Sequence, residues 1–178
     1  MVDPVLLILT DISRILYSSR LPETVAYPML RDSLSSGQMK SKLEALRIIQ
    51  NSKLKFNSGL FLAHWHGLFP RLLRNFGLFK NADGHEIDPE WVEFSNLLNA
   101  DWSWSSVKQN AETAPQAKYD LVVNTSCEHM GNNWMKQIQA NTYVLAQTTN
   151  YAHSTHINTC TSLYEMHCFC KSLKVQDG

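Results

Sequence analysis

The chain lacks a charge excess of either sign. Its 178 residues contain 16 lysines and arginines and 16 aspartates and glutamates, so the formal net charge is zero. Without a global positive field there is no long-range attraction to phosphate backbones, and we expect no nucleic-acid partner. A protein without net charge also repels copies of itself only weakly, which favours self-association.

The chain also lacks a long apolar run. The longest run near its N-terminus, Val5 to Leu9, is far shorter than the roughly 20 residues that cross a bilayer. Asp3 and Asp11 flank this run, where a secretory leader would carry basic residues. We therefore expect no signal peptide, no transmembrane helix and no membrane partner.

Cysteine is sparse, and its spacing is not that of a metal site. The four cysteines are Cys127, Cys160, Cys168 and Cys170, and they do not form the C-x-x-C pairs typical of zinc sites. Reduced thiols in a cytoplasmic protein are the simplest interpretation. Cys127 would be a nucleophile only if a histidine activated it, and the residue order of a cysteine protease is absent, so we expect a buried thiol.

What is present is the composition of a folded domain with a helical beginning. Apolar residues make up 44% of the chain and charged residues 18%, which is typical of a packed globular protein. In the first fifty residues the apolar positions recur at helical spacing and predict three helices, which begin at Pro4, near Leu21 and after Gly37. Asp3 is the expected N-cap of the first helix.

From Lys53 onward, short apolar runs alternate with helical segments. The predicted strands are 56–63, 84–87, 104–108, 119–124 and 142–147, and the predicted helices are 68–76, 89–98, 132–138 and 162–169. This α/β alternation implies right-handed crossovers and a doubly wound, mostly parallel, Rossmann-like sheet with helices on both faces. We expect residues 1–53 to form an N-terminal helical cap and residues 54–178 to form the α/β domain.

In such a sheet, ligands bind beyond the carboxyl ends of the strands, where the strand order reverses. The loop Ala63 to Gly67 (AHWHG) follows the first strand and leads into a helix, whose free N–H groups favour a carboxylate-bearing ligand. The second strand ends at Glu86, and an ionised carboxylate there can accept hydrogen bonds from both hydroxyls of a ribose. A solvated glutamate is the alternative, whereas Asp88 is expected to cap the helix beginning at Pro89.

Four segments, in order, resemble parts of class I methyltransferases that depend on S-adenosylmethionine (SAM). Gly84 to Glu90 (GHEIDPE) resembles the second-strand segment of that family, and Tyr119 to Met130 (YDLVVNTSCEHM) resembles its fourth strand and the Glu-His pair that often follows. Asn141 to Tyr151 (NTYVLAQTTNY) is similar to the fifth strand, and His156 to Met166 to a later His, Thr-x-x-Glu-Leu stretch. The resemblance covers about residues 54–175.

The resemblance implies an enzyme that uses SAM as cofactor and transfers its methyl group to a small-molecule acceptor. The cofactor-binding residues that it implies are Ala63, His64, Trp65, His66, Gly67, Glu86, Ile87, Asn110, Ala111, Asn124, Thr125 and Ser126. The first loop would cradle the methionine end, Glu86 would bind the ribose, Asn110 and Ala111 would lie beside the adenine, and residues 124–126 beneath the sulfonium.

His129 has two interpretations. In a methyltransferase it would lie near the transferred methyl group, where an imidazole can take a proton from the acceptor, so it is the candidate catalytic residue. The alternative is a structural role, in which the ring packs against the neighbouring helix and caps it.

The chain departs from the family in two places. The family's first loop normally has an acidic residue and two or three glycines, whereas only Gly67 is present here. The family's sheet usually closes with an antiparallel hairpin, for which only Leu173 to Val175 remains, so we expect an open edge that favours a homo-oligomer. A methyltransferase-like binding or assembly module without methyl transfer is therefore the main alternative.

Seven histidines raise a third hypothesis, a metal-dependent hydrolase. His64-x-His66 follows a strand, and its possible companions are Glu86, His129, His153 and His156. The carboxylate positions expected of such hydrolases are not evident, and the chain is too short for a complete (β/α)₈ barrel. We therefore predict no metal site.

Overall fold

A computed structural model of the chain describes residues 4–18, 31–113, 119–149, 153–160, 162 and 165. The expected N-cap Asp3, the helix expected near Leu21 and most of the helix expected at 162–169 lie outside these ranges. The segment Leu173 to Val175, which was the one candidate for a closing strand, lies outside them as well.

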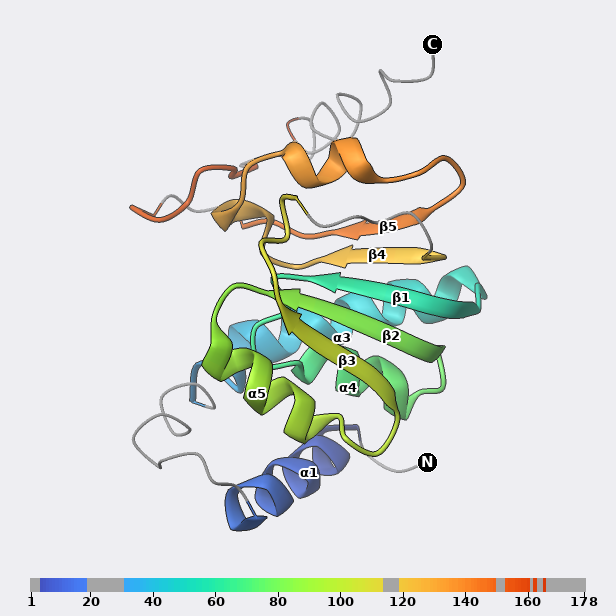
Figure 1. The fold of residues 1–178 in the computed structure, drawn as a ribbon, viewed down its shortest axis with the longest axis vertical. Helices are drawn as coiled ribbons and strands as arrows, with labels where there is room; N and C mark the ends of the chain where they lie inside the picture. The colour runs from blue at the N-terminus through green and yellow to red at the C-terminus, as the bar shows by residue number, and fades with distance from the viewer. Residues whose placement is uncertain are drawn as a thin grey trace.

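Five parallel strands form one sheet in the order β3-β2-β1-β4-β5 (Figure 1). The strands are β1 Phe56–Leu62, β2 Phe79–Glu86, β3 Ser103–Lys108, β4 Leu121–Asn124 and β5 Tyr143–Ala146. The chain builds outward from β1 to β3 and then crosses back to β4 on the other side of β1. The predicted doubly wound, Rossmann-like sheet is therefore confirmed, with its strand order reversing between β1 and β4.

Within the described ranges, four α-helices and two short 3-10 helices accompany the sheet. The α-helices are α1 Pro4–Ser18, α3 Ser36–Ser52, α4 Leu68–Asn75 and α5 Pro89–Leu98, and the 3-10 helices are η1 Cys127–His129 and η2 Asn133–Gln137. The segment predicted as a helix at 132–138 is thus a 3-10 helix, and only Trp134 is buried within it. In the described ranges, no helix combines the length and apolar character needed to cross a bilayer.

The two faces of the sheet bury different residues because strand side chains alternate. Phe61 of β1 packs with the apolar residues of α1, α3, α4 and α5 in the larger core. Its neighbours Leu60 and Leu62 face the other way and pack with Val122, Met130 and Trp134. The α-helices therefore cover one face, and the chain around η1 and η2 covers the other.

β2 begins five residues before the strand predicted at 84–87. The five residues before the predicted start include Asn81 and Asp83, which are typical of turns. Register with β1 and β3 overrides this local preference, because β2 pairs on both sides. The Tyr119 hydroxyl donates a hydrogen bond to Asp83 Oδ2 at 2.6 Å, which stabilises that carboxylate within the strand.

Asp88 caps α5 as predicted. Its side chain accepts hydrogen bonds from the backbone N–H groups of Glu90 at 2.8 Å and Trp91 at 3.4 Å, and Pro89 is the first helical residue. The cap places the start of α5 directly after Glu86, at the carboxyl edge of the sheet.

A buried arginine joins α1 to the rest of the molecule. Arg71 of α4 is 5% exposed; its Nε donates to Asp11 Oδ2 of α1 at 2.6 Å, and its two terminal nitrogens donate to the Asp101 carboxylate. α1 packs against α4 and α5, on the side of the molecule away from β5 (Figure 1).

Candidate functional site

A cavity of about 210 Å³ lies beyond the carboxyl ends of β1 to β4, where the strand order reverses. The predicted site residues that line it are Ala63, Glu86, Ile87, Asn110, Ala111 and His129. Three further lining residues, His85, Glu112 and Met130, were missed by sequence reasoning. Each of them is next in sequence to a predicted site residue, and this was the one sequence feature that could have identified them.

Glu86 is 3% exposed, and backbone N–H groups hold its carboxylate. Oε1 accepts from Ile87 at 2.8 Å and from Asp88 at 3.2 Å, while Oε2 accepts from Trp65 at 2.9 Å. Burial raises the pKa of Glu86, and these three donors act in the opposite direction. A carboxylate has about four acceptor positions, so Oε2 keeps one position for a ligand instead of the two that we expected for a ribose.

The loop after β1 has a glycine-like backbone at residues that are mostly not glycine. The φ angles are 45° at Ala63, 60° at Trp65 and 73° at Gly67, all in the left-handed region. Glycine enters this region without penalty, whereas other residues resist it. At Gly67 glycine is also required for space, because a Cβ atom would lie 2.3 Å from Ser95 Oγ.

The side chains of His64 and His66 are buried and do not line the cavity. The His64 Nε2 atom lies 2.7 Å from Ser106 Oγ, and the His64 ring meets Trp104 edge-on. His66 is 1% exposed and stacks on Trp65 at 4.4 Å between ring centroids. The predicted cradle residues His64, Trp65, His66 and Gly67 thus lie behind the cavity wall, and Ala63 alone reaches it.

Stability should fall on acidification because of these buried imidazoles. Burial lowers the pKa of His64 to about 3 and that of His66 well below its usual value. Between pH 6.5 and 3 the unfolded chain therefore binds more protons, so the stability present above pH 6.5 is lost as pH falls. His64 alone should remove about 2 kcal/mol of unfolding free energy between pH 7 and pH 5. Urea midpoints at pH 7, 6 and 5 measure this loss.

The raised pKa of Glu86 acts in the opposite direction, so the control must isolate the histidines. His66→Phe replaces one buried imidazole by a ring that does not titrate, and the loss of stability on acidification should become smaller in this variant. A wild-type midpoint that is the same at pH 7 and pH 5 would contradict the assignment of neutral, buried rings at positions 64 and 66.

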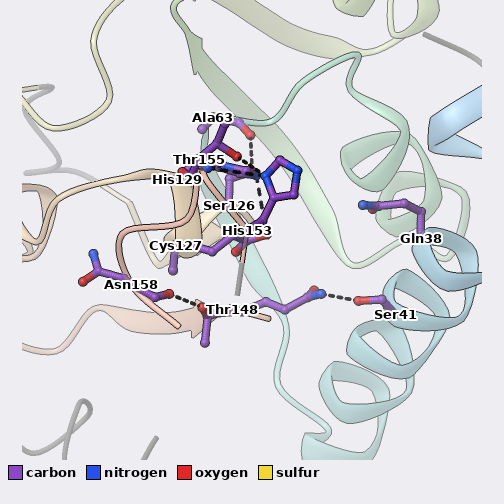
Figure 2. A network of polar contacts seen from close by, with 12 residues as sticks. Gln38, Ser41, Ala63, Ser126, Cys127, His129, Thr148, His153, Thr155 and Asn158 are labelled. Carbon is purple, nitrogen blue, oxygen red and sulfur yellow. Dashed lines mark hydrogen bonds and ion pairs between the residues drawn. The ribbon is translucent and has the colours of Figure 1, made fainter. Parts of the chain in front are cut away.

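The residues after β4 support the loop from behind. Asn124 is fully buried, and its Oδ1 accepts from the Ser126 backbone N–H at 3.0 Å. The Ser126 hydroxyl donates to the Ala63 carbonyl at 3.1 Å, as Figure 2 shows. Asn124, Thr125 and Ser126, predicted beneath the sulfonium, therefore do not line the cavity. Ser126, held by Asn124, contacts Ala63 instead.

His129 lines the cavity and contacts the 153–158 segment. Its Nδ1 lies 3.3 Å from the Thr155 carbonyl oxygen (Figure 2), and its ring meets His156 at 4.8 Å between centroids. Its Nε2 lies 3.9 Å from Glu128 Oε1. A neutral ring that donates from Nδ1 to Thr155 keeps Nε2 as a proton acceptor.

Two other hypotheses lose support here. Within the part of the chain that the structure describes, no three His, Cys, Asp or Glu side chains come close enough to hold a metal ion. The histidines separate because His64 and His66 enter the core while His129 lies at the cavity. Cys127 is the expected buried thiol, and burial raises its pKa to about 12, so it stays protonated at neutral pH.

Solved structures show which fold this is. No protein-family model matches the sequence, and a search of curated proteins finds no match. The complex of DhpI with S-adenosylhomocysteine (SAH) superposes with a TM-score of 0.61 at 14% identity, over 80% of this chain and 79% of that one. The N-methyltransferase NodS from Bradyrhizobium japonicum, also in complex with SAH, has a TM-score of 0.54 at 14% identity, over 78% of this chain and 71% of that one. YcgJ from Bacillus subtilis superposes with a TM-score of 0.58 at 11% identity, over 73% of this chain and 67% of that one.

At these identities the likeness concerns the fold. The strand order, the parallel sheet and the cavity at its carboxyl edge agree with it. The chain therefore has the Rossmann-like fold of class I SAM-dependent methyltransferases.

Proposed function

We propose that the cavity binds SAM and that the protein transfers its methyl group to a small-molecule acceptor. The observation that supports this most is the position of Glu86. It ends β2 and lines the same cavity as Ala63, Asn110 and Ala111. These four residues come from the ends of three different strands, and the family resemblance assigns all of them to the cofactor.

The cavity has groups that suit a nucleoside. Glu86 Oε2 offers one acceptor position for a ribose hydroxyl. Ile87 is 65% exposed beside it and offers an apolar surface on which a base can pack. Asn110 and Ala111 form the next part of the lining and would lie along the edge of the adenine.

The charge of the lining favours SAM over a dinucleotide, the other ligand common in such sheets. Glu86 and Glu112 both line the cavity, and the described residues that line it include no lysine or arginine. A pyrophosphate would meet two carboxylates without a compensating cation, whereas a sulfonium would be attracted.

The residues of this chain would mainly orient the reactants. Bound SAM would supply an electrophilic methyl group on its sulfonium. Transfer to an acceptor needs alignment and exclusion of water more than covalent help from the protein. We assign His129 Nε2 the role of accepting the acceptor's proton, with Glu128 Oε1 at 3.9 Å placed to stabilise the imidazolium.

The N-terminal residues are proposed to complete the acceptor site. The Gln147 side chain, directly after β5, donates to the Ser41 hydroxyl of α3 (Figure 2). The first turns of α3 therefore lie at the carboxyl edge of the sheet. Residues 1–53 would act there as the cap that shapes the acceptor pocket over residues 54–178.

Calorimetry with SAM and SAH tests the proposal, with NAD as the control ligand. SAM and SAH should bind with one site per chain, and NAD should not bind measurably. If neither SAM nor SAH binds at millimolar concentration, the proposed function is wrong. Tighter binding of NAD would show that the charge argument fails.

One observation favours the alternative of a binding module without methyl transfer. The protein's own backbone uses three of the four acceptor positions of Glu86. One position is therefore left for a ribose, where two were expected. Incubation with methyl-labelled SAM and a pool of small-molecule acceptors separates the two functions. Label transferred to an acceptor supports the enzyme, whereas SAH binding without any transfer supports the module.

We also propose that a second copy pairs along β5. This is the outermost strand of the described sheet, and the side chains of Tyr143 and Val144 are exposed on it. An edge strand with apolar side chains favours pairing with another chain. Light scattering should give twice the monomer mass, and Val144→Lys should restore the monomer; a monomeric wild type would exclude the pairing.

A further inference from the structure

A carboxylate in the cavity wall joins two segments that are far apart in the sequence. Glu112 follows β3 and lines the cavity, and its Oε1 accepts a hydrogen bond from the Gly131 backbone N–H at 2.8 Å. Gly131 follows Met130, another lining residue. The Glu112 carbonyl also accepts from the Gln137 side chain at 2.9 Å. Glu112 is thus bound to the segment after β4 through both its side chain and its backbone.

The segment that carries Glu112 is itself held in a fixed turn. The Asn110 side chain accepts from the Glu112 backbone N–H at 2.9 Å, and the Asn110 carbonyl accepts from Thr113 at 3.2 Å. Asn110 and Ala111, which we assign to the adenine, belong to this turn. Any movement of Glu112 relative to Gly131 therefore moves the assigned adenine wall relative to Met130 and His129.

Gly131 is needed for space. A Cβ atom at this position would lie 2.9 Å from Glu112 Oε2, 3.2 Å from Oε1 and 3.3 Å from Cδ. No left-handed backbone angle applies at Gly131. A side chain at position 131 would therefore require the end of the Glu112 side chain to shift, which weakens its hydrogen bond to the Gly131 N–H, and this conflict would vanish if Glu112 were absent.

We infer that Glu112 is a positioning residue, which sets the affinity for the nucleoside by clamping the adenine wall to the wall after β4 through Gly131. The inference rests on the proposed function for its ligand, but the clamp itself is a property of the free protein. The hydrogen bond is charge-assisted and half-buried, so its loss should loosen the wall without unfolding the chain.

A double-mutant cycle on SAH binding tests the clamp by calorimetry. Glu112→Ala should weaken SAH binding by about tenfold, the scale of one lost charge-assisted hydrogen bond. Gly131→Ala, which only shifts the carboxylate, should weaken SAH binding measurably but by less than Glu112→Ala. Glu112→Gln keeps an acceptor for the Gly131 N–H and should stay within about threefold of wild type. The double variant should be no weaker than Glu112→Ala alone, because the clash needs the carboxylate. Glu93→Ala, which removes an exposed glutamate on α5, is the matched control.

A ligand-free measurement separates this inference from the proposed function. Hydrogen exchange at the Gly131 amide should be slow in the wild type and about tenfold faster in Glu112→Ala, at a nearly unchanged melting temperature. If SAH does not bind but the exchange result holds, the proposed function fails and the clamp stands. Fast exchange in the wild type, or additive losses in the cycle, would overturn the clamp.

Discussion

Replacing Glu86 by alanine is expected to weaken SAM binding by about 1.5 to 3 kcal/mol, the scale of a lost hydrogen bond to a charged group. The reason is that Oε2 holds the acceptor position left for the ribose in the cavity. Calorimetry on the wild type and the variant measures the difference. Glu90→Ala, which removes an exposed carboxylate four residues away, should leave the affinity unchanged.

The same substitution should also lower stability, which the sequence alone did not indicate. Alanine removes the acceptor of three backbone N–H groups, at Trp65, Ile87 and Asp88. The free energy of unfolding is expected to fall by about 1 to 3 kcal/mol, because the part-buried Trp65 N–H loses its acceptor. Urea unfolding gives this value separately from affinity. Unchanged SAM affinity in a folded variant would show that Glu86 does not contact the ligand.

Arg71→Ala is expected to have the largest effect on stability, a loss of about 3 to 5 kcal/mol. The guanidinium is buried and holds two carboxylates, Asp11 of α1 and Asp101 after α5. Without it, the half-buried Asp11 loses the ion pair that Arg71 Nε makes with it at 2.6 Å, and α1 loses its polar anchor on α4. Urea unfolding monitored by circular dichroism measures the loss.

An exposed ion pair in the same protein provides the control. Arg47 and Glu44 of α3 form a bidentate contact with side chains that are 61% and 53% exposed. Arg47→Ala should lower the free energy of unfolding far less than Arg71→Ala does, because solvent screens such a pair. Equal losses for the two variants would mean that burial of Arg71 does not determine the strength of its contacts.

The sheet could be predicted because its central strands carry continuous apolar runs. β1 and β4 lie within one residue or two of the predicted ranges, since strands buried on both faces need such runs. The start of β2 was missed because Asn81 and Asp83 carry a turn signal that pairing on both sides overrides. The residue types in the first part of β2 do not indicate a strand; its pairing with β1 and β3 does.

The sequence predicts which residues lie at the ends of the strands and so near the candidate site. It does not predict whether their side chains point into the cavity or into the core. The positions of Ala63, Glu86 and Ala111 follow from where the strands stop. The burial of His64 and His66 depends on left-handed backbone at Ala63 and Trp65, which nothing in those residue types indicates. The single glycine of the loop, Gly67, thus did not indicate the two further left-handed positions, Ala63 and Trp65.

The partners of Glu86 and Glu112 were beyond local reasoning for a related reason. Trp65 and Glu86 are 21 residues apart, and Glu112 and Gly131 are 19 residues apart. Each contact depends on the sheet bringing two loops to one edge. Hydrogen bonds of this kind fix the positions of the loop residues that line the cavity.

Amide chemical shifts during an SAH titration show whether the nucleoside binds at the carboxyl edge of the sheet. We expect the shifted amides to cluster at Ala63, Ile87, Ala111 and Met130. Shifts confined to the smaller cavity around Asp83 and Tyr119, toward the opposite edge, would contradict this expectation. A spectrum that SAH leaves unchanged at millimolar concentration would contradict it as well.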